Sequence, residues 1–225
     1  MENPYAPPGT TVPTEGDGPL EEPKPTLTPA ASNGLLVLAC GFAISAILSA
    51  VYGWLMSTPV YVDSVPDGML GSIMWGLALL TRFGLGVGYL MCTFVPAKTN
   101  ATQWAVSAAF MHYVGGVMGG SATTDTMVVM VVCFFGAPTL FWLCLYRVAK
   151  WCDSERLKRA TARLAWVGII ALLLSVVAST AFLLAGTPKQ TYFAEQVFGV
   201  VSGLLAAANW LYYAWVAWQF QRELR

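Results

Sequence analysis

The sequence predicts an all-α integral membrane protein whose six transmembrane helices form a single bundle. The first observation is composition: 56% of the 225 residues are hydrophobic and 11% are charged, whereas soluble domains carry about 25% charged residues. The second is the division of the chain into six apolar stretches by connections rich in proline, glycine or charge. The third is the placement of the basic residues, nearly all of which fall in connections on one side of the membrane.

Residues 1–33 form a tail that we expect to be disordered and cytoplasmic. Eight of the thirteen prolines fall in this segment, and glycine, threonine and glutamate fill most of the remaining positions. Such a composition cannot bury enough apolar surface to offset the entropy lost on folding. The segment also lacks the basic start and apolar core of a signal peptide.

The first two expected helices, 34–56 and 68–95, each carry a stripe of small residues. The first is 23 residues long, which at about 1.5 Å per residue exceeds the roughly 30 Å hydrocarbon core of a bilayer. Arg82 lies off the second stripe and is the only charged residue in its range. Small side chains four apart let a neighbouring helix approach closely. The two stripes are Gly41, Ser45, Ser49 and Gly53, and Gly68, Ser72, Gly76, Gly84 and Gly88.

The middle of the chain supplies two further helices, 104–120 and 127–148. The third helix is short and contains His112, the only histidine of the sequence. The fourth contains Pro138 in its interior, where proline removes one intrahelical hydrogen bond, so we expect a bend there.

A basic connection leads to the last two helices, 164–185 and 194–218, and to a short cytoplasmic tail, 219–225. Glu155 precedes Arg159 by four positions, a spacing that favours helix within the connection. We expect the basic cluster to face anionic lipid head groups on the cytoplasmic side, and docking of an acidic partner is the alternative. The cluster consists of Arg147, Lys150, Arg156, Lys158, Arg159 and Arg163.

The distribution of lysine and arginine predicts that both termini are cytoplasmic. With six spans, ten basic residues fall on one side and Lys189 alone falls on the other, which the positive-inside rule assigns to the exterior. If the short third helix turned back without crossing, the basic cluster would face outside, so the rule favours six spans. Compact connections and the missing targeting segment fit a bacterial inner (plasma) membrane.

Three polar residues, Arg82, His112 and Asn209, are the candidate ligand- or ion-binding residues. Counting from the ends of the expected helices places all three at similar depth, where a charge is costly and indicates a functional site by default. The carboxylates near the spans map to their outer edge, so Arg82 has no acidic partner at its own level, and a bound anion is one way to balance its charge. A purely structural role is the alternative for Arg82 and for His112, and a proton relay is a further role open to His112.

The sequence contains no motif for catalysis, metal binding or a cofactor. HExxH, P-loop and GxSxG patterns are missing, and none of the five cysteines forms a CxxC pair. We therefore expect no enzymatic activity, no metal and no cofactor. Nor does any basic stripe of the kind that binds nucleic acid occur.

Two classes of function remain. The sparse polar lining favours a non-catalytic membrane component: a scaffold, an assembly factor or a small subunit of a membrane complex. Its partners would be the lipid bilayer and other proteins, or a second copy of the chain, held through the small-residue faces. The alternative is a small transporter or channel in which Arg82, His112 and Asn209 handle anions or protons. A polar cavity around Arg82 would favour transport, and a small-residue face turned to lipid would favour a subunit.

Overall fold

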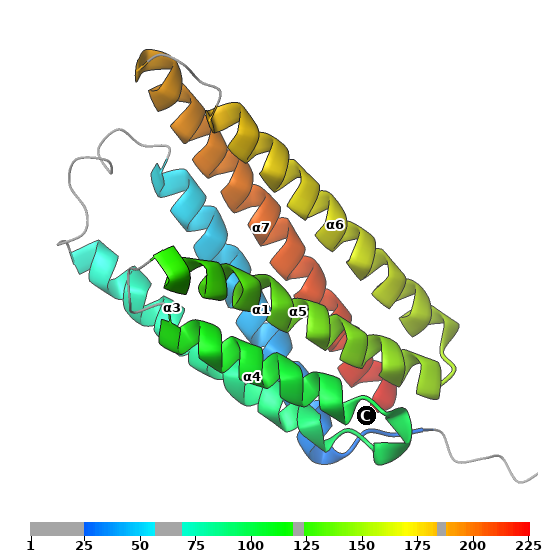
Figure 1. Ribbon diagram of the computed structural model, residues 1–225. Coiled ribbons are helices and arrows are strands. Elements are labelled where there is room, and N and C mark those ends of the chain that lie inside the picture. Colours follow the sequence, from blue (N-terminus) through cyan, green and yellow to red (C-terminus); the bar gives the residue numbers. More distant parts are fainter. Residues whose placement is uncertain (1–24, 57–68, 119–123, 184–187) are drawn as a thin grey trace, which may run out of the picture.

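The computed structural model describes residues 25–56, 69–118, 124–183 and 188–225, and within these ranges the chain is helical, without a strand (Figure 1). Two short 3₁₀ turns, η1 (Cys92–Phe94) and η2 (Ala97–Thr99), connect α3 to α4. The long helices are α1 (Pro29–Met56), α3 (Met69–Met91), α4 (Thr102–Met118), α5 (Thr124–Trp151), α6 (Glu155–Leu183) and α7 (Pro188–Leu224).

Three stretches of these helices are long and apolar enough to cross a membrane, counted over the described residues alone. They are Pro29–Leu55 in α1, Ser72–Phe94 at α3 and Gly199–Leu224 in α7. The fold is therefore all-helical and compatible with membrane insertion.

α1 begins at Pro29, five residues before the expected position 34. Thr28 caps it, because its Oγ1 accepts a hydrogen bond from the N–H of Ala31 at 3.2 Å. Proline at the first helical position loses no hydrogen bond, since that N–H has no partner inside the helix. Leu27 is buried and its N–H donates to the carbonyl of Leu224 at 2.9 Å. The last part of the expected tail is thus packed, and residues 1–24 lie outside the described chain.

The last two helices are also longer than expected. α6 begins at Glu155, nine residues before the expected position 164, and α7 continues to Leu224, six residues beyond 218. Phe220 and Leu224 are buried. The polar start of α6 and the polar end of α7 are helical because these two flanks pack against one another.

The helices run up and down, and one end of the bundle gathers most of the described charge. Thr28 Oγ1 donates to the carbonyl of Phe94 at 2.6 Å, and Ser154 Oγ donates to Glu223 Oε2 at 3.2 Å. The start of α1, the η1–η2 connection, the α5–α6 turn and the end of α7 therefore lie together, beside the C-terminus in Figure 1. We call this the basic end, because Lys98, the basic cluster, Arg222 and Arg225 all belong to it.

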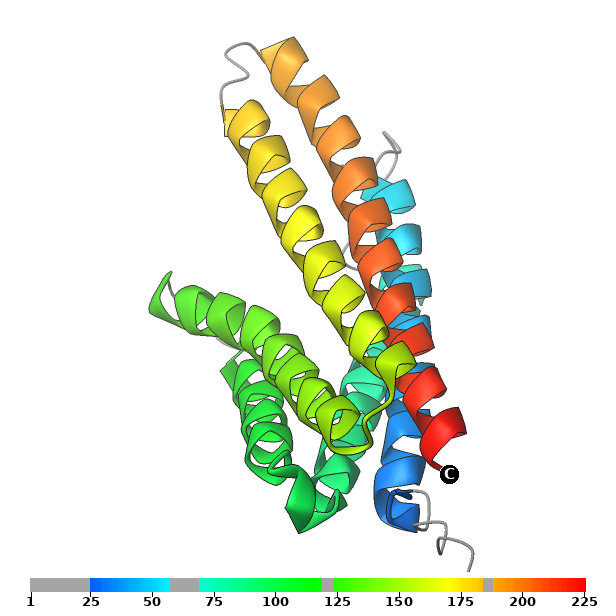
Figure 2. The ribbon, with the colours of Figure 1, turned by 90° about the vertical axis from the view of Figure 1, so that its right-hand side faces the viewer.

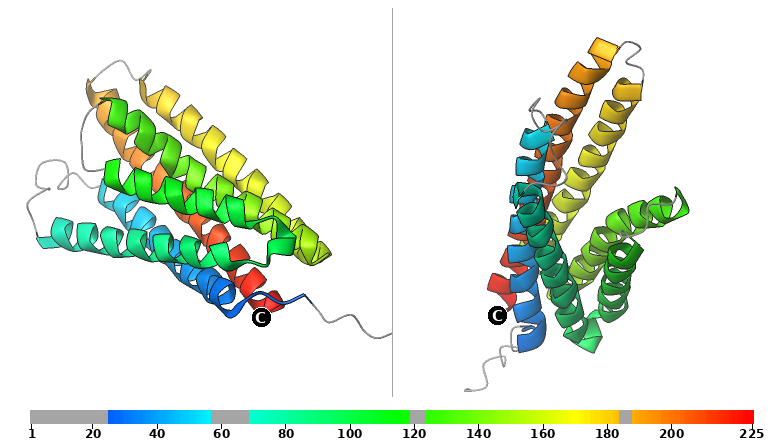
Figure 3. Two further views of the ribbon diagram at one scale, coloured as in Figure 1. Left: turned by 60° about the horizontal axis from the view of Figure 1, so that its bottom comes forward. Right: turned by 90° about the vertical axis from the view of Figure 1, so that its left-hand side faces the viewer.

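α1 lies along α7 and α3, α4 lies along α5, and α6 lies along α7. Figures 2 and 3 show that α5 and α6 are close at their connecting turn and separate toward their other ends. The pair α4–α5 consequently leans away from the pair α6–α7. This divergence positions the two cavities described below.

Glycines bring α1 and α7 into backbone contact. A Cβ atom on Gly53 would lie 2.8 Å from the carbonyl oxygen of Gly199, and one on Gly203 would lie 2.7 Å from Cα of Gly53. The α1 stripe thus serves packing inside the bundle. The α3 stripe is only partly used: Gly88 meets Leu38, whereas a Cβ at Gly76 or Gly84 would meet no atom within 4 Å.

Aromatic rings from four helices pack around Phe42 of α1. Phe42 is fully buried and stacks on Trp210 of α7, with ring centroids 5.5 Å apart and planes inclined by 10°. Tyr89 of α3, Phe141 of α5 and Tyr213 of α7 complete the cluster, with centroids 5.3–6.3 Å from that of Phe42. This cluster joins α1, α3, α5 and α7 beside the cavities.

Candidate functional site

Arg82 lines a cavity of about 240 Å³ in the middle of the bundle. Residues of α1, α3, α4, α5 and α7 form its walls, so five helices converge on one space. Most wall residues are apolar, and the polar ones are Ser45, Ser49, Thr81, Arg82, Tyr89 and His112. We call this space the arginine cavity.

The structure brings Arg82 and His112 into this one cavity. His112 Nε2 lies 2.8 Å from the backbone carbonyl oxygen of Arg82. Because a carbonyl oxygen only accepts hydrogen bonds, Nε2 must carry the proton and donate it. In the neutral ring Nδ1 is therefore the nitrogen with an available lone pair. The ring also packs against Tyr89, with centroids 5.4 Å apart.

The Arg82 side chain has no ion pair or hydrogen bond within the described part of the chain. Among the described residues, no carboxylate lines the arginine cavity. An arginine keeps its charge under all ordinary conditions, so the cavity holds an uncompensated positive charge. This arrangement attracts an anion.

The hydroxyl groups of the arginine cavity differ in whether their protons are already used in hydrogen bonds within the protein. Thr81 and Ser45 donate to the carbonyls of Leu77 and Gly41, at 2.7 and 2.9 Å, so their protons are engaged within their own helices. Tyr89 is buried, and its O–H has no hydrogen-bond partner among the described residues. The donors available to a ligand are therefore Arg82, Tyr89 and Ser49, whose hydroxyl also has no hydrogen-bond partner among the described residues.

Tyr89 was not among the residues selected from the sequence. It lies seven positions after Arg82, so both belong to one face of α3. That spacing is the signal by which sequence reasoning could have included it.

Asn209 lies in a separate cavity from Arg82 and His112. This second cavity has a volume of about 500 Å³ and lies between α5, α6 and α7. The Oδ1 atom of Asn209 is buried and lacks a hydrogen-bond partner. Pro138, Ala206 and Trp210 line both cavities, so the two spaces adjoin. We call the second space the apolar cavity.

Pro138 stands where the two cavities adjoin. α5 remains helical on both sides of it. The O–H of Tyr213 donates to the carbonyl of Pro138 at 3.3 Å, which ties α5 to α7. The proline that sequence reasoning selected as a bend thus also forms part of both cavity walls.

The basic cluster lies at the basic end, and part of it is neutralised. Arg156 Nε lies 3.1 Å from Glu223 Oε1 of α7. Lys158 pairs with Asp153 and with Glu155, so Glu155 pairs three positions ahead rather than with Arg159. The cluster members without an ion pair in the described chain are Arg147, Lys150, Arg159 and Arg163.

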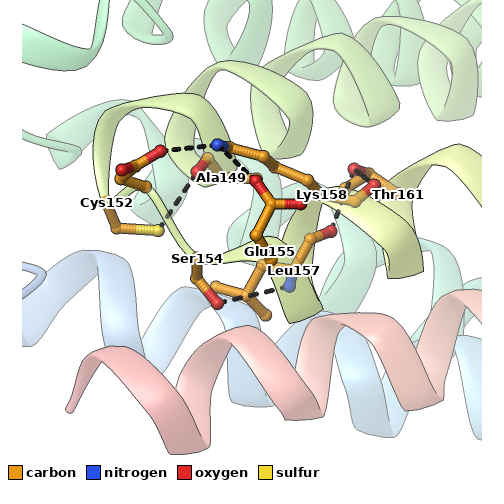
Figure 4. Close-up of polar contacts among 8 residues, drawn as sticks. Ala149, Cys152, Ser154, Glu155, Leu157, Lys158 and Thr161 are labelled. Carbon is orange, nitrogen blue, oxygen red and sulfur yellow. Dashed lines mark hydrogen bonds and ion pairs between the residues drawn. The ribbon is translucent and has the colours of Figure 1, made fainter.

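Local contacts shape the α5–α6 turn that carries this cluster (Figure 4). Asp153 has a φ of 51°, a left-handed conformation that aspartate tolerates. Ser154 caps α6, because its Oγ accepts a hydrogen bond from the N–H of Leu157 at 3.3 Å. Hydrogen bonds to Asp153 and Glu155 raise the pKa of Lys158 above its usual value. The turn is therefore ordered by its own polar groups.

No group of three or more histidine, cysteine, aspartate or glutamate side chains is placed to hold a metal ion, as far as the described residues show. No family model, curated protein or solved structure matches the chain.

Proposed function

We propose that the protein is a six-span integral membrane protein that binds an anion inside its bundle and acts as a small, non-catalytic transporter. The observation that carries this proposal is the cavity around Arg82. The sequence alone favours a scaffold or subunit because polar lining is sparse. An uncompensated arginine in a mid-bundle cavity supports transport instead.

The proposed membrane arrangement has both termini in the cytoplasm of a bacterial cell. It is supported by the six apolar stretches of the sequence and by the gathering of basic residues at one end of the helices. Positive residues concentrate on the cytoplasmic side of membrane proteins. The exposed arginines and lysines there would contact anionic lipid head groups.

Binding of an anion predicts a stabilisation that depends on Arg82. A ligand present at 100 times its Kd stabilises the folded state by about 2.7 kcal/mol. Thermal unfolding in detergent, scanned over a panel of anions, should show a raised Tm for the native protein. Arg82→Gln should remain folded and lose that shift, because its side chain has no charge.

The matched control is Lys98→Gln, which removes one positive charge from the exposed η2 turn. It should keep the full anion response, because Lys98 lines neither cavity. An equal response of the native protein and Arg82→Gln to every anion would contradict the proposal.

A second candidate function is a subunit of a membrane complex. The observation that favours it is the part of α3 from residue 75 to residue 84, where Trp75, Leu80 and Phe83 are exposed. A Cβ on Gly76 or Gly84 would meet nothing within 4 Å, so another helix has room to approach here. Purification of the chain with a stoichiometric partner after mild extraction would favour this candidate over transport.

A further inference from the structure

The arginine cavity and the apolar cavity adjoin, so one ligand could reach both. They share Pro138 of α5 and Ala206 and Trp210 of α7. Ala206 is the smallest of these three shared residues. A ligand longer than the arginine cavity could therefore extend past this position into the apolar cavity.

The chemistry of the two cavities differs. No charged residue lines the apolar cavity within the described part of the chain. Its hydroxyl and indole protons are engaged with backbone carbonyls: Thr139 donates to Phe135 at 2.7 Å and Trp142 Nε1 donates to Thr161 at 2.7 Å. Apart from the unpaired Oδ1 of Asn209, its walls therefore suit hydrocarbon, whereas the arginine cavity offers a positive charge. The combined site matches a molecule with one charged and one apolar part.

The apolar cavity lies where the helices separate. α5 and α6 diverge from their turn (Figure 2), and the cavity is lined by both. Phe135 and Ile169 line it and are also partly exposed on the surface of the bundle. In a bilayer that surface faces lipid chains, so a hydrophobic ligand can enter sideways from the membrane.

We propose that the ligand is a single-chain amphiphile with an anionic head group, such as a long-chain carboxylate. The head group pairs with the Arg82 guanidinium, assisted by the O–H of Tyr89, and the chain occupies the apolar cavity. This inference rests on the proposed function and names the class of anion that it handles. A lipid with two chains and a freely soluble anion are the competing ligands.

The decisive experiment measures binding of radiolabelled hexadecanoate to the purified native chain at a pH where the carboxylate is ionised. Gly168 lines the apolar cavity, and a Cβ there would meet no atom within 4 Å. Gly168→Leu therefore fills the cavity without a clash at its first atom. Gly116→Leu is the matched control, because Gly116 has the same free space and lines neither cavity.

We expect Arg82→Gln and Gly168→Leu each to weaken hexadecanoate binding at least tenfold, and Gly116→Leu to leave it unchanged. Acetate should displace hexadecanoate poorly, and hexadecanol should bind at least tenfold more weakly than hexadecanoate. Detergent partitioning affects every variant equally, so it cancels when variants are compared with the same ligand, and ligands are compared at equal measured free concentrations. Thermal unfolding without ligand checks that each variant is folded, and Ala165→Leu replaces Gly168→Leu if that variant is not.

The alternative outcomes separate the inference from the proposed function. If acetate or chloride binds in an Arg82-dependent way and Gly168→Leu has no effect on hexadecanoate, the amphiphile inference is overturned and anion binding stands. If a two-chain anionic lipid displaces hexadecanoate more strongly than single-chain acids do, the single-chain ligand is overturned. If hexadecanol binds as well as hexadecanoate and Arg82→Gln has no effect, both proposals fail.

Discussion

Single glycines decide how closely α1 and α7 approach. A Cβ on Gly53 would press against the backbone of α7, which cannot move aside as a flexible side chain can. We expect Gly53→Ala to lower the free energy of unfolding by about 1–3 kcal/mol, the usual cost of overpacking. Denaturant unfolding in detergent measures this change.

Gly76→Ala is the control for helix propensity. Its Cβ would enter open space, so this variant should be neutral or more stable by up to about 1 kcal/mol, the helix preference of alanine over glycine. Equal effects of the two substitutions would show that the close contact at Gly53 is unimportant.

The α5–α6 turn is an element whose contacts depend on pH. The Lys158 ammonium donates a hydrogen bond to the Asp153 carboxylate and so holds the pKa of Asp153 below its usual range. Because the pKa is lower in the folded state, the contact contributes its full stabilisation at pH values above the unfolded-state pKa of about 3.9. Its contribution is lost as the pH falls through the folded-state pKa.

We therefore expect the Asp153 carboxyl to titrate below about 3.9, and to return to that ordinary value in Lys158→Gln. The carboxyl carbon chemical shift of Asp153, followed by NMR over acidic pH, measures its pKa in the native protein and in Lys158→Gln. The site is exposed, so high salt should weaken the difference. An unchanged Asp153 pKa in Lys158→Gln would show that the contact does not form.

At the scale of elements, hydrophobic patterning predicts helices but not where they end. Apolar stretches predict a helix at every range where the structure has a long one, including the short third stretch at 104–120. The observed helix ends differ from the predicted ends where capping and tertiary contacts extend a helix into polar sequence. Thr28 and Pro29 start α1 inside a proline-rich segment that was interpreted as tail, and Ser154 starts α6 inside the basic connection.

The sequence predicts the depth of the candidate site residues but not the direction in which each side chain points. Counting residues along each helix predicts that Arg82, His112 and Asn209 lie at one level. It does not predict which neighbour each faces, because that depends on helix rotation and on the divergence of α5 from α6. Asn209 consequently faces the apolar cavity, while Arg82 and His112 share the other.

For the whole molecule, the proposed orientation predicts which end is reached from the cytoplasm. Lys98 belongs to the basic end, and Lys189 is the single basic residue that the sequence assigns outside. A membrane-impermeant maleimide should label Lys189→Cys in spheroplasts and Lys98→Cys in inside-out vesicles. The background carries alanine at Cys40 and Cys152, the two cysteines that are not buried. Labelling of both positions from one side, or in the reverse pattern, would contradict the orientation.

The pairing of α1 with α7 has a consequence for biosynthesis. Among the described helices this pair has the most extensive contact, and it joins the first long helix to the last. α1 is synthesised before α7, so its glycine face has no α7 to pack against until α7 emerges from the ribosome. Pairing of α1 with α7 is then a late event that brings together distant parts of the chain. A chain truncated before α7 should remain an open assembly that quality-control proteases degrade.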